Sequence, residues 1–269
     1  MKYKGLSTAE ADLLSRLAAA GKTVFSTTEA QELWEGSTPI TTVLHRLEKK
    51  GWLQRAERGV YLLIPLEAGP DRTWSESPLV IAPYLIQPAA VAYWSALHYW
   101  QMTEQIPRIT FVQSTKQKRP VEIRGMRFRF VTIREEKFFG ILERNLNSKK
   151  FPITDREKTL IDCAHRPDLS GGSMQLAQAL ETACSEIDWP KLDGYLKRWG
   201  GGTVVKRLGY LVEGLKLPIP EREQCLAEWQ KLLSRGISSL EPGAGHSGPV
   251  VTRWRLRINV DALSPEGLK

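Results

Sequence analysis

The 269-residue sequence has few of the residue types that form disulfides or metal sites. Its three cysteines, Cys163, Cys184 and Cys225, stand far apart and include no CxxC pair. The odd number and the wide spacing argue against a disulfide framework and against zinc. Four histidines are equally scattered, with no HxxxH or HExxH spacing. We therefore expect no metal and no cofactor.

Long apolar runs are also missing. No run reaches the length of a membrane span, and the start MKYKGLSTAEADLL lacks the apolar block of a signal peptide. We therefore expect a soluble, cytoplasmic protein without a membrane partner. Hydrophobic residues make up 42% of the chain, so a sizeable core is available, and the length suits two domains.

Catalytic signatures such as GxSxG, a phosphate-binding GxxxxGK[ST] loop and a Cys/His pair at a spacing useful for catalysis are absent from the sequence. Asp155 and Asp162 would lie about two helical turns, roughly 10 Å, apart, which is far for a shared metal. Asp155 is expected to cap a helix, and Glu157 and Lys158 to form a surface pair. His98 is expected to be a buried, satisfied histidine. These features predict that the protein is not an enzyme.

Net charge is +8, and residues 108–150 carry 12 Lys and Arg against 4 Asp and Glu. This excess favours an acidic partner, nucleic acid first. In VEIRGMRFRFVTIR, apolar and basic residues alternate around a turn or bulge at Gly125, with Phe128 and Phe130 expected to face the core. The basic face either contacts phosphates or is a solvated sheet surface. Its candidates for secondary phosphate contacts are Lys116, Lys118, Arg119, Arg124, Arg127 and Arg129.

The first sixty residues predict three helices, near residues 7–21, 27–36 and 37–51, and a hairpin with a polar tip at 56–59. Ser7 is expected to cap the first helix in a capping box with Glu10, Thr27 or Thr28 the second, and Ser37 the third, which is expected to end at Gly51. This order is that of a winged helix-turn-helix, whose third helix enters the major groove. An ordinary amphipathic helix or a protein-interaction module is the alternative.

Assigning Ile40, Val43, Leu44 and Leu47 to the core leaves a hydroxyl-rich and basic face for DNA. Arg46 can bind guanine with two hydrogen bonds or pair with phosphate. The residues near the end of the helix and on the wing suit phosphate. The candidate DNA-binding residues are Ser37, Thr38, Thr41, Thr42, His45, Arg46, Lys49, Lys50, Arg55 and Arg58.

The predicted fold class is α+β, with a winged helix-turn-helix over residues 1–66, a linker over 67–78 and a larger mixed α/β domain over 79–269. The linker is rich in Pro, Gly and Ser. In the second domain we expect a buried helix over PAAVAYWSALHYWQM, a small antiparallel or mixed sheet and several helices. TRWRLRINV is expected to be a final alternating strand.

With these elements in place, the sequence resembles the AbiEi-type antitoxins of bacterial type IV toxin–antitoxin systems, from about residue 7 to about residue 260. The resemblance rests on the order and spacing of several motifs. They are GVYLLIP, LVIAPYLIQPAAVAYWSALHYWQMTEQIP, FFG, DREKTLIDCAHRPDLSGG, VVKRLGYLVEGL and RWRLRINV.

This resemblance implies a two-domain regulator, with a winged helix that binds inverted repeats in its own promoter and represses transcription. It implies a C-terminal domain that counters a nucleotidyltransferase toxin without a stable complex, in the setting of phage defence. Without a visible coiled coil, we expect a monomer or weak dimer that binds the DNA repeat cooperatively. The alternatives are a solitary regulator, a nucleic-acid-processing enzyme with a DNA-binding arm, and an adaptor that has lost DNA binding.

Overall fold

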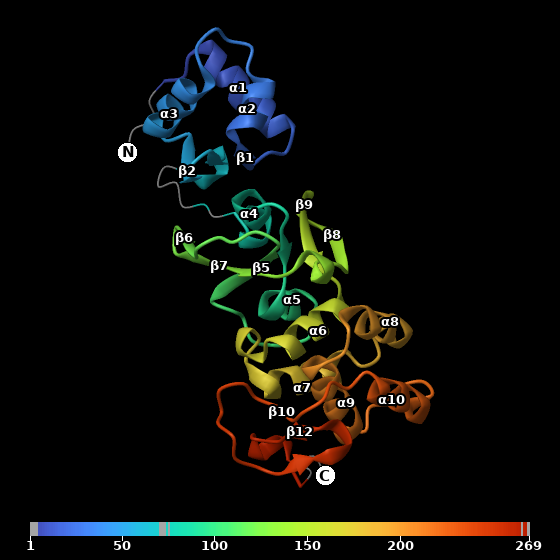
Figure 1. The fold of residues 1–269 in the computed structure, drawn as a ribbon. Coiled ribbons are helices and arrows are strands. Elements are labelled where there is room, and N and C mark those ends of the chain that lie inside the picture. The colour runs from blue at the N-terminus through green and yellow to red at the C-terminus, as the bar shows by residue number, and fades with distance from the viewer. Residues whose placement is uncertain (1–4, 70–73, 75, 265, 268–269) are drawn as a thin grey trace.

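The computed structural model describes residues 5–69, 74, 76–264 and 266–267. Figure 1 shows an N-terminal unit above a six-stranded sheet and a group of helices below that sheet. This architecture confirms the expected α+β class, with a winged helix followed by a larger mixed α/β region. No helix within the described ranges is both long and apolar enough to cross a membrane.

The N-terminal unit has three helices and a three-stranded antiparallel sheet of order β1-β3-β2. A capping box between Ser7 and Glu10 starts the first helix, as the sequence predicts. The second helix is capped by Ser26 rather than by Thr27 or Thr28, because Ser26 stands three residues before Glu29 and completes a second capping box. The elements are α1 Thr8–Ala19, β1 Val24–Ser26, α2 Thr27–Leu33, α3 Ile40–Lys50, β2 Leu53–Glu57 and β3 Val60–Leu63.

Strand β3 is buried on both faces and joins two hydrophobic cores. Phe25 and Tyr61 point into the core of the winged helix, whereas Val24 and Leu62 pack into the main core. Each of these pairs is in direct register between β1 and β3. The main core also holds residues of the helix α4, Pro78–Leu85, so the back of the winged-helix sheet rests on α4.

The central sheet has the order β6-β7-β5-β4-β9-β8 and mixes parallel and antiparallel pairs. Helix α4 lies on one face, and α5 and α6 lie toward the other (Figure 1). The strands are β4 Ala90–Val91, β5 Ile109–Ser114, β6 Val121–Ile123, β7 Met126–Thr132, β8 Ile141–Leu146 and β9 Lys149–Thr154.

Below the sheet, α6 packs against α5, α7, α8 and α9 (Figure 1). A small third sheet of two-residue strands, order β10-β12-β11, follows near the C-terminus. The helices are α5 Tyr93–Tyr99, α6 Arg156–His165, α7 Gly172–Ala183, α8 Trp189–Trp199, α9 Thr203–Gly214 and α10 Arg222–Lys231. The 3₁₀ turns are η1 Leu66–Ala68, η2 Glu135–Lys137, η3 Pro167–Leu169, η4 Thr252–Trp254 and η5 Asp261–Leu263, and the short strands are β10 Ser238–Ser239, β11 Val250–Val251 and β12 Leu256–Arg257.

Two predicted elements of the second region were wrong. The apolar stretch PAAVAYWSALHYWQM is not one helix: Ala90 and Val91 pair with β5 and β9 at the centre of the sheet, and only α5 is helical. An apolar run buried on all sides suits a central strand as well as a helix. The expected final strand over TRWRLRINV is instead the turn η4 followed by the two-residue strand β12.

Part of the predicted linker, at residues 70–73 and 75, lies outside the described residues. At its end, Ser77 caps α4 and Pro78 is the first helical residue. Before α4, Glu76 is buried and accepts hydrogen bonds from Lys149 (2.5 Å) and from Thr23 of the winged helix. The chain that follows the winged helix is thus fixed to both units where it enters α4.

Candidate nucleic-acid interface

Helix α3 is held by an apolar face and presents a polar one. Ile40, Val43, Leu44 and Leu47 are buried in the winged-helix core. The helix begins at Ile40 with Pro39 at the N-cap and no side-chain cap, so the prediction that Ser37 caps it was wrong. Proline at that position displaces the helix start by two residues. The helix ends where the sequence predicts, at Gly51, which adopts the left-handed conformation (φ 78°).

The turn before α3 is tied to α2 by Trp34, whose indole N–H donates to the carbonyl of Thr38 (2.8 Å). Gly36 lies against this indole, where an added Cβ would meet the ring at 2.2 Å. The contact positions the polar start of α3. The predicted residues Ser37, Thr41, Thr42, His45, Arg46 and Lys49 are exposed on α3 and the turn before it, and Thr38 is half-buried.

The charged side chains of α3 differ in whether they form ion pairs with other residues. Arg46 has no ion pair within the described part of the chain. His45 lies 3.8 Å from the Glu48 carboxylate. Lys50 pairs with the buried Glu10 of α1 at 2.5 Å. Burial tends to raise the pKa of Glu10, but hydrogen bonds from Lys50 and Ser7 outweigh it and lower that pKa. A phosphate at Lys50 would therefore compete with Glu10.

The wing is the β2–β3 hairpin, with Arg58 and Gly59 at its turn. Gly59 has φ 82°, and its carbonyl accepts from the Thr27 N–H at 2.8 Å, so the wing tip is held by the start of α2. A bulge between Arg55 and Glu57 interrupts the ladder. Arg55 and Arg58 are exposed, as a phosphate-contacting wing requires.

The wing is also fixed to the second region. Both carboxylate oxygens of Glu57 accept from the Lys118 ammonium at 2.8 Å, and this ammonium lies 5.6 Å from the centre of the Phe130 ring. Sequence reasoning missed the contact, because nothing in the local pattern links two positions 61 residues apart. The pair places the loop between β5 and β6, which carries Lys116 and Arg119, beside the wing.

The structure divides the predicted basic sheet residues into two groups. Phe128 and Phe130 are buried, as the alternation predicts, and β6 and β7 form a hairpin that turns at Arg124 and Gly125. Arg127 and Arg129 are in register with Ile109 and Phe111 of β5, and therefore share their face of the sheet.

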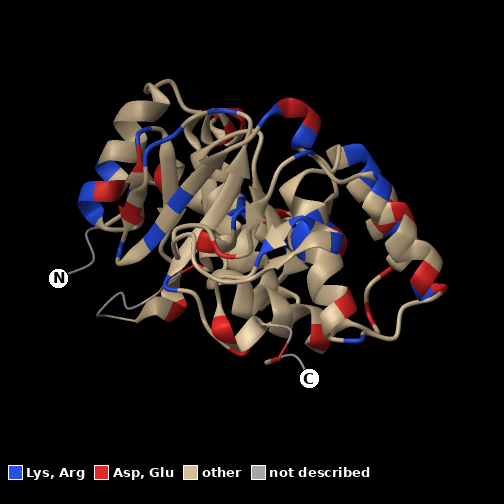
Figure 2. Cartoon of the chain, turned by 60° about the horizontal axis from the view of Figure 1, so that its bottom comes forward, with Lys and Arg blue, Asp and Glu red and all other residues tan. Residues whose placement is uncertain are grey.

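That shared face belongs to the core of α5 and η3, and not to the core that contains the winged-helix residues Val24 and Leu62. Arg129 lies 5.9 Å from the Phe111 ring centre and electrostatically lowers the pKa of Asp168, after the larger effect of the Arg166 hydrogen bond. In Figure 2, basic bands alternate with uncharged ones along strands of the sheet. Lys116, Lys118 and Arg119 lie by the wing, whereas Arg127 and Arg129 lie on the far face.

The acidic residues of α6 do not form an open site. Asp155 caps the helix as predicted, accepting from the Lys158 N–H at 2.8 Å. Glu157 and Lys158 are buried, so the predicted surface pair was wrong. Lys191 lies 3.0 Å from Asp155 and 2.8 Å from Glu157, and an ammonium thus occupies the space between these carboxylates. These hydrogen bonds outweigh the effect of burial and raise the pKa of Lys191.

The described residues contain no group of three or more His, Cys, Asp or Glu side chains that could hold a metal. His98, expected to be buried, is exposed on α5. The Ser170–Gly172 loop precedes α7, and a helix start of this kind could bind an anion, but the N–H of Ser173 already donates to the Glu241 carboxylate at 2.5 Å. Gly200 and Gly202 of the GGGT stretch are the caps of α8 and α9.

The N-terminal unit, which contains α3 and the wing, is similar to a known family. Residues 12–64 match the model of a family described as "Transcriptional regulator, AbiEi antitoxin". These residues run from within α1 to the end of β3 and so hold most of the N-terminal unit. The AbiEi resemblance drawn from the sequence is thereby confirmed over these residues, which include α3 and the wing.

Beyond the AbiEi match, the whole chain has a fold seen before. It is similar to the crystal structure of the RV2827C protein from Mycobacterium tuberculosis, with a TM-score of 0.62 and 16% sequence identity. The similarity covers 94% of this chain and 92% of that chain, so both regions are shared. At this identity it shows the fold alone. No curated protein matches the sequence.

Proposed function

We propose that the protein is a sequence-specific transcriptional repressor and the antitoxin of a type IV toxin–antitoxin system. Helix α3 would read an inverted repeat in the promoter of its own operon. The observation that carries this proposal is the exposed face of α3, with Thr41, Thr42, His45 and Arg46, inside the segment that matches the AbiEi family. Hydroxyl groups and an unpaired guanidinium are suited to base edges.

The DNA surface that we propose extends from α3 over the wing to the loop between β5 and β6. Arg55 and Arg58 of the wing would contact phosphate, and Lys116 and Arg119 of the neighbouring loop would add further contacts. Arg127 and Arg129 face the other side of the sheet. Arg127 and Arg129 therefore lie outside the surface that we propose for the DNA duplex bound by α3 and the wing.

The second region would counteract a nucleotidyltransferase toxin in the cytoplasm, without a stable complex and without catalytic activity of its own. A protomer would be monomeric or weakly dimeric and would bind the two half-sites cooperatively. A second candidate is a solitary regulator, which is favoured by the restriction of the family match to the winged helix. Rescue of growth when the protein is co-expressed with a toxin from the neighbouring reading frame would separate the two candidates.

A gel-shift titration of the upstream promoter fragment tests the DNA-binding proposal, with a scrambled fragment of equal length as the control. Tighter binding to the promoter supports it, and equal affinity for both fragments contradicts it. Because phosphate contacts dominate nonspecific affinity, both titrations must be run at the same, stated salt concentration.

A further inference from the structure

A cleft separates the winged helix from the second region, on the side of β8 and β9. Its two lobes have volumes of about 400 Å³ and 230 Å³. Tyr84 of α4 and Lys150 of β9 line both lobes, so the lobes lie next to each other. The larger lobe is within the size range of small-molecule sites. Since β8 and β6 are opposite edges of the sheet, the cleft lies away from the Lys118 contact with the wing.

Three lysines line the smaller lobe: Lys22 from the winged helix, and Lys149 and Lys150 from β9. The Lys22 and Lys149 ammonium groups each lie 2.5 Å from a glutamate, and that of Lys150 lies 2.6 Å from one. Lysine is a common phosphate ligand, and three lysines that line one cavity suit a phosphate once it displaces their glutamate partners.

The glutamates that pair with these lysines have other partners. Glu29 accepts from the Ser26 N–H at 2.7 Å, and Glu76 accepts from the Ser77 N–H at 2.9 Å. Glu143, the partner of Lys150, has 60% of its side chain exposed. An anion would compete with these glutamates for the lysines, as at Lys50, but its binding would leave no carboxylate both buried and without a hydrogen bond, which is the costly outcome.

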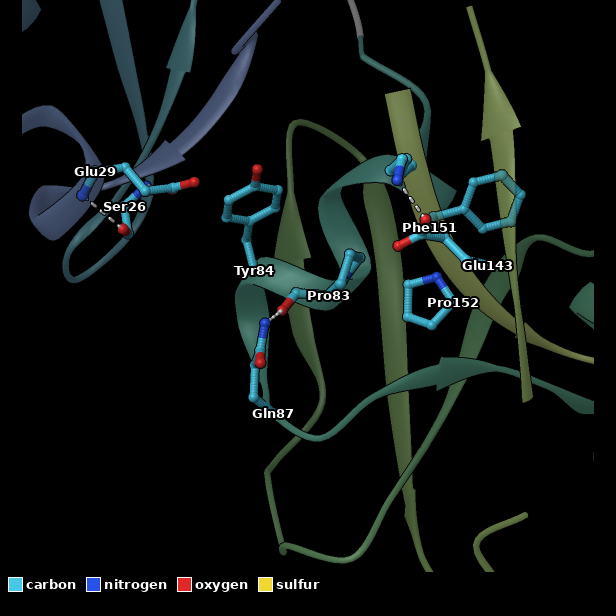
Figure 3. A pocket seen from close by; sticks show the side chains of 9 residues that line it. Ser26, Glu29, Pro83, Tyr84, Gln87, Glu143, Phe151 and Pro152 are labelled. Carbon is cyan, nitrogen blue, oxygen red and sulfur yellow. Dashed lines mark hydrogen bonds and ion pairs between the residues drawn. The ribbon is translucent and has the colours of Figure 1, made fainter. Parts of the chain in front are cut away.

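The wall of the larger lobe combines polar and apolar side chains, with the Tyr84 ring among them. Figure 3 shows Tyr84 with its ring between Glu29 of the winged helix and the residues Pro83, Phe151 and Pro152 of the second region. The Tyr84 hydroxyl makes no hydrogen bond to another described residue, and its ring is half-buried. An aromatic face of this kind can stack on a nucleobase.

We propose that this cleft binds a nucleoside phosphate, with the phosphate on Lys22, Lys149 and Lys150 and the base against Tyr84. The walls belong to two units, so a ligand that touches both favours one orientation of the winged helix over others. Occupancy then changes the position of α3 relative to the basic loop at Lys116 and Arg119. This second, regulatory half of the inference rests on the proposed DNA-binding function.

Calorimetric titration of the full-length protein with adenosine 5′-monophosphate, in the absence of DNA, tests the binding half. We expect one site, which Lys150→Met weakens at least roughly tenfold, the loss expected for one charge-assisted hydrogen bond. Lys150 is suited to substitution because 68% of its side chain is exposed. Lys231→Met is the matched control, since its side chain is also 68% exposed and pairs with a glutamate at 2.5 Å.

Titrations with adenosine and with inorganic phosphate test the base-binding and the phosphate-binding parts of the site separately. Tyr84→Leu should weaken adenosine 5′-monophosphate but leave phosphate unchanged, and adenosine should bind more weakly than the monophosphate. Absence of a binding signal at millimolar nucleotide, equal binding of adenosine and the monophosphate, or the same loss in Lys150→Met and Lys231→Met would overturn the proposal. Arg46→Ala should bind the nucleotide as the wild type does, which excludes a site on the DNA face.

A gel shift with and without the nucleotide tests the regulatory half. We expect the affinity for the promoter fragment to change at least threefold in the wild type and to stay constant in Lys150→Met. Nucleotide binding with no effect on promoter affinity overturns the regulatory half alone. Failure to prefer the promoter over scrambled DNA overturns the proposed function, while the calorimetric result on the cleft stands by itself.

Discussion

Lys158 and Asp162 lie one turn apart on α6 and form an ion pair in which neither side chain is exposed. The Lys158 ammonium also lies 3.4 Å from the amide oxygen of Gln113 and 5.2 Å from the ring centres of Phe139 and Trp199. Burial raises the pKa of Asp162, against the opposing effect of Lys158. Each charge is tolerated at this depth because the other is present.

Lys158→Met should lower the free energy of unfolding by about 3–5 kcal/mol, because it leaves the Asp162 carboxylate buried without its partner. Urea unfolding followed by tryptophan fluorescence measures this loss. The double variant Lys158→Met/Asp162→Leu should recover most of it, since an apolar pair replaces both charges. A single variant as stable as the wild type would show that the pair is not needed.

Gly209→Ala should destabilise the protein by at least about 1–3 kcal/mol, the usual cost of overpacking a core. The reason is that a Cβ at this position of α9 would meet the Trp254 ring at 2.1 Å. Thermal unfolding measures the effect. Gly194 of α8 is the matched control: a Cβ there meets nothing within 4 Å, so Gly194→Ala should stabilise by roughly 0.5–1 kcal/mol.

Because Glu76 contacts both units, we expect the free energy of unfolding to depend on pH in the acidic range. Burial tends to raise the pKa of Glu76, but hydrogen bonds from Lys149, Thr23 and the Ser77 N–H outweigh it, and the pKa falls below its ordinary 4.5. A lowered carboxyl pKa contributes stability that is complete above pH 4.5 and is lost as the pH falls through the folded-state value. Urea midpoints at pH 7 and pH 3 should therefore differ more for the wild type than for Glu76→Gln. Equal differences would contradict this reasoning.

Arg46→Ala should lose about 1–3 kcal/mol of binding free energy on the promoter fragment and little on scrambled DNA, because a bidentate contact to a base discriminates by that amount. Fluorescence anisotropy with both fragments measures this. An equal loss on the two fragments would instead assign Arg46 to phosphate. Circular dichroism of the variant serves as the folding control, since Arg46 is exposed on α3.

Arg119→Ala should reduce the slope of log K against log salt by about 0.9, the value for one phosphate contact on duplex DNA. Arg129→Ala should leave the slope unchanged, because Arg129 lies on the face of the sheet that borders α5. Both residues are exposed arginines, so each controls for the other. A reduced slope in Arg129→Ala alone would place DNA on the opposite face from the winged helix.

Features that depend on residues close together in the sequence could be predicted from local patterns. The capping box at Ser7, the left-handed Gly51 and the alternation around Phe128 and Phe130 are confirmed. The burial of Glu157 could not be predicted in this way, because its partner Lys191 comes from another helix.

The face of the sheet on which each arginine lies could not be predicted from the sequence either, because it depends on how the strands pair. The alternation predicts that Arg127 and Arg129 share a face, but only the pairing of β7 with β5 shows which face it is. The basic residues nearest the wing were identified through Lys118 and Glu57, a contact between segments that the sequence assigns to different domains. The apolar run that includes Val60 and Leu62 was a local signal of burial on both sides of a strand.

Because β3 belongs to two cores, the winged helix is not an interchangeable module. Cutting the chain after residue 66 would expose Val24, Val60 and Leu62 to water, and grafting another winged helix would need the same apolar back on its sheet. The shared core also sets the distance between α3 and the basic loop at Lys116 in the ligand-free chain, so on the function that we propose the length of DNA that one protomer covers depends on this strand.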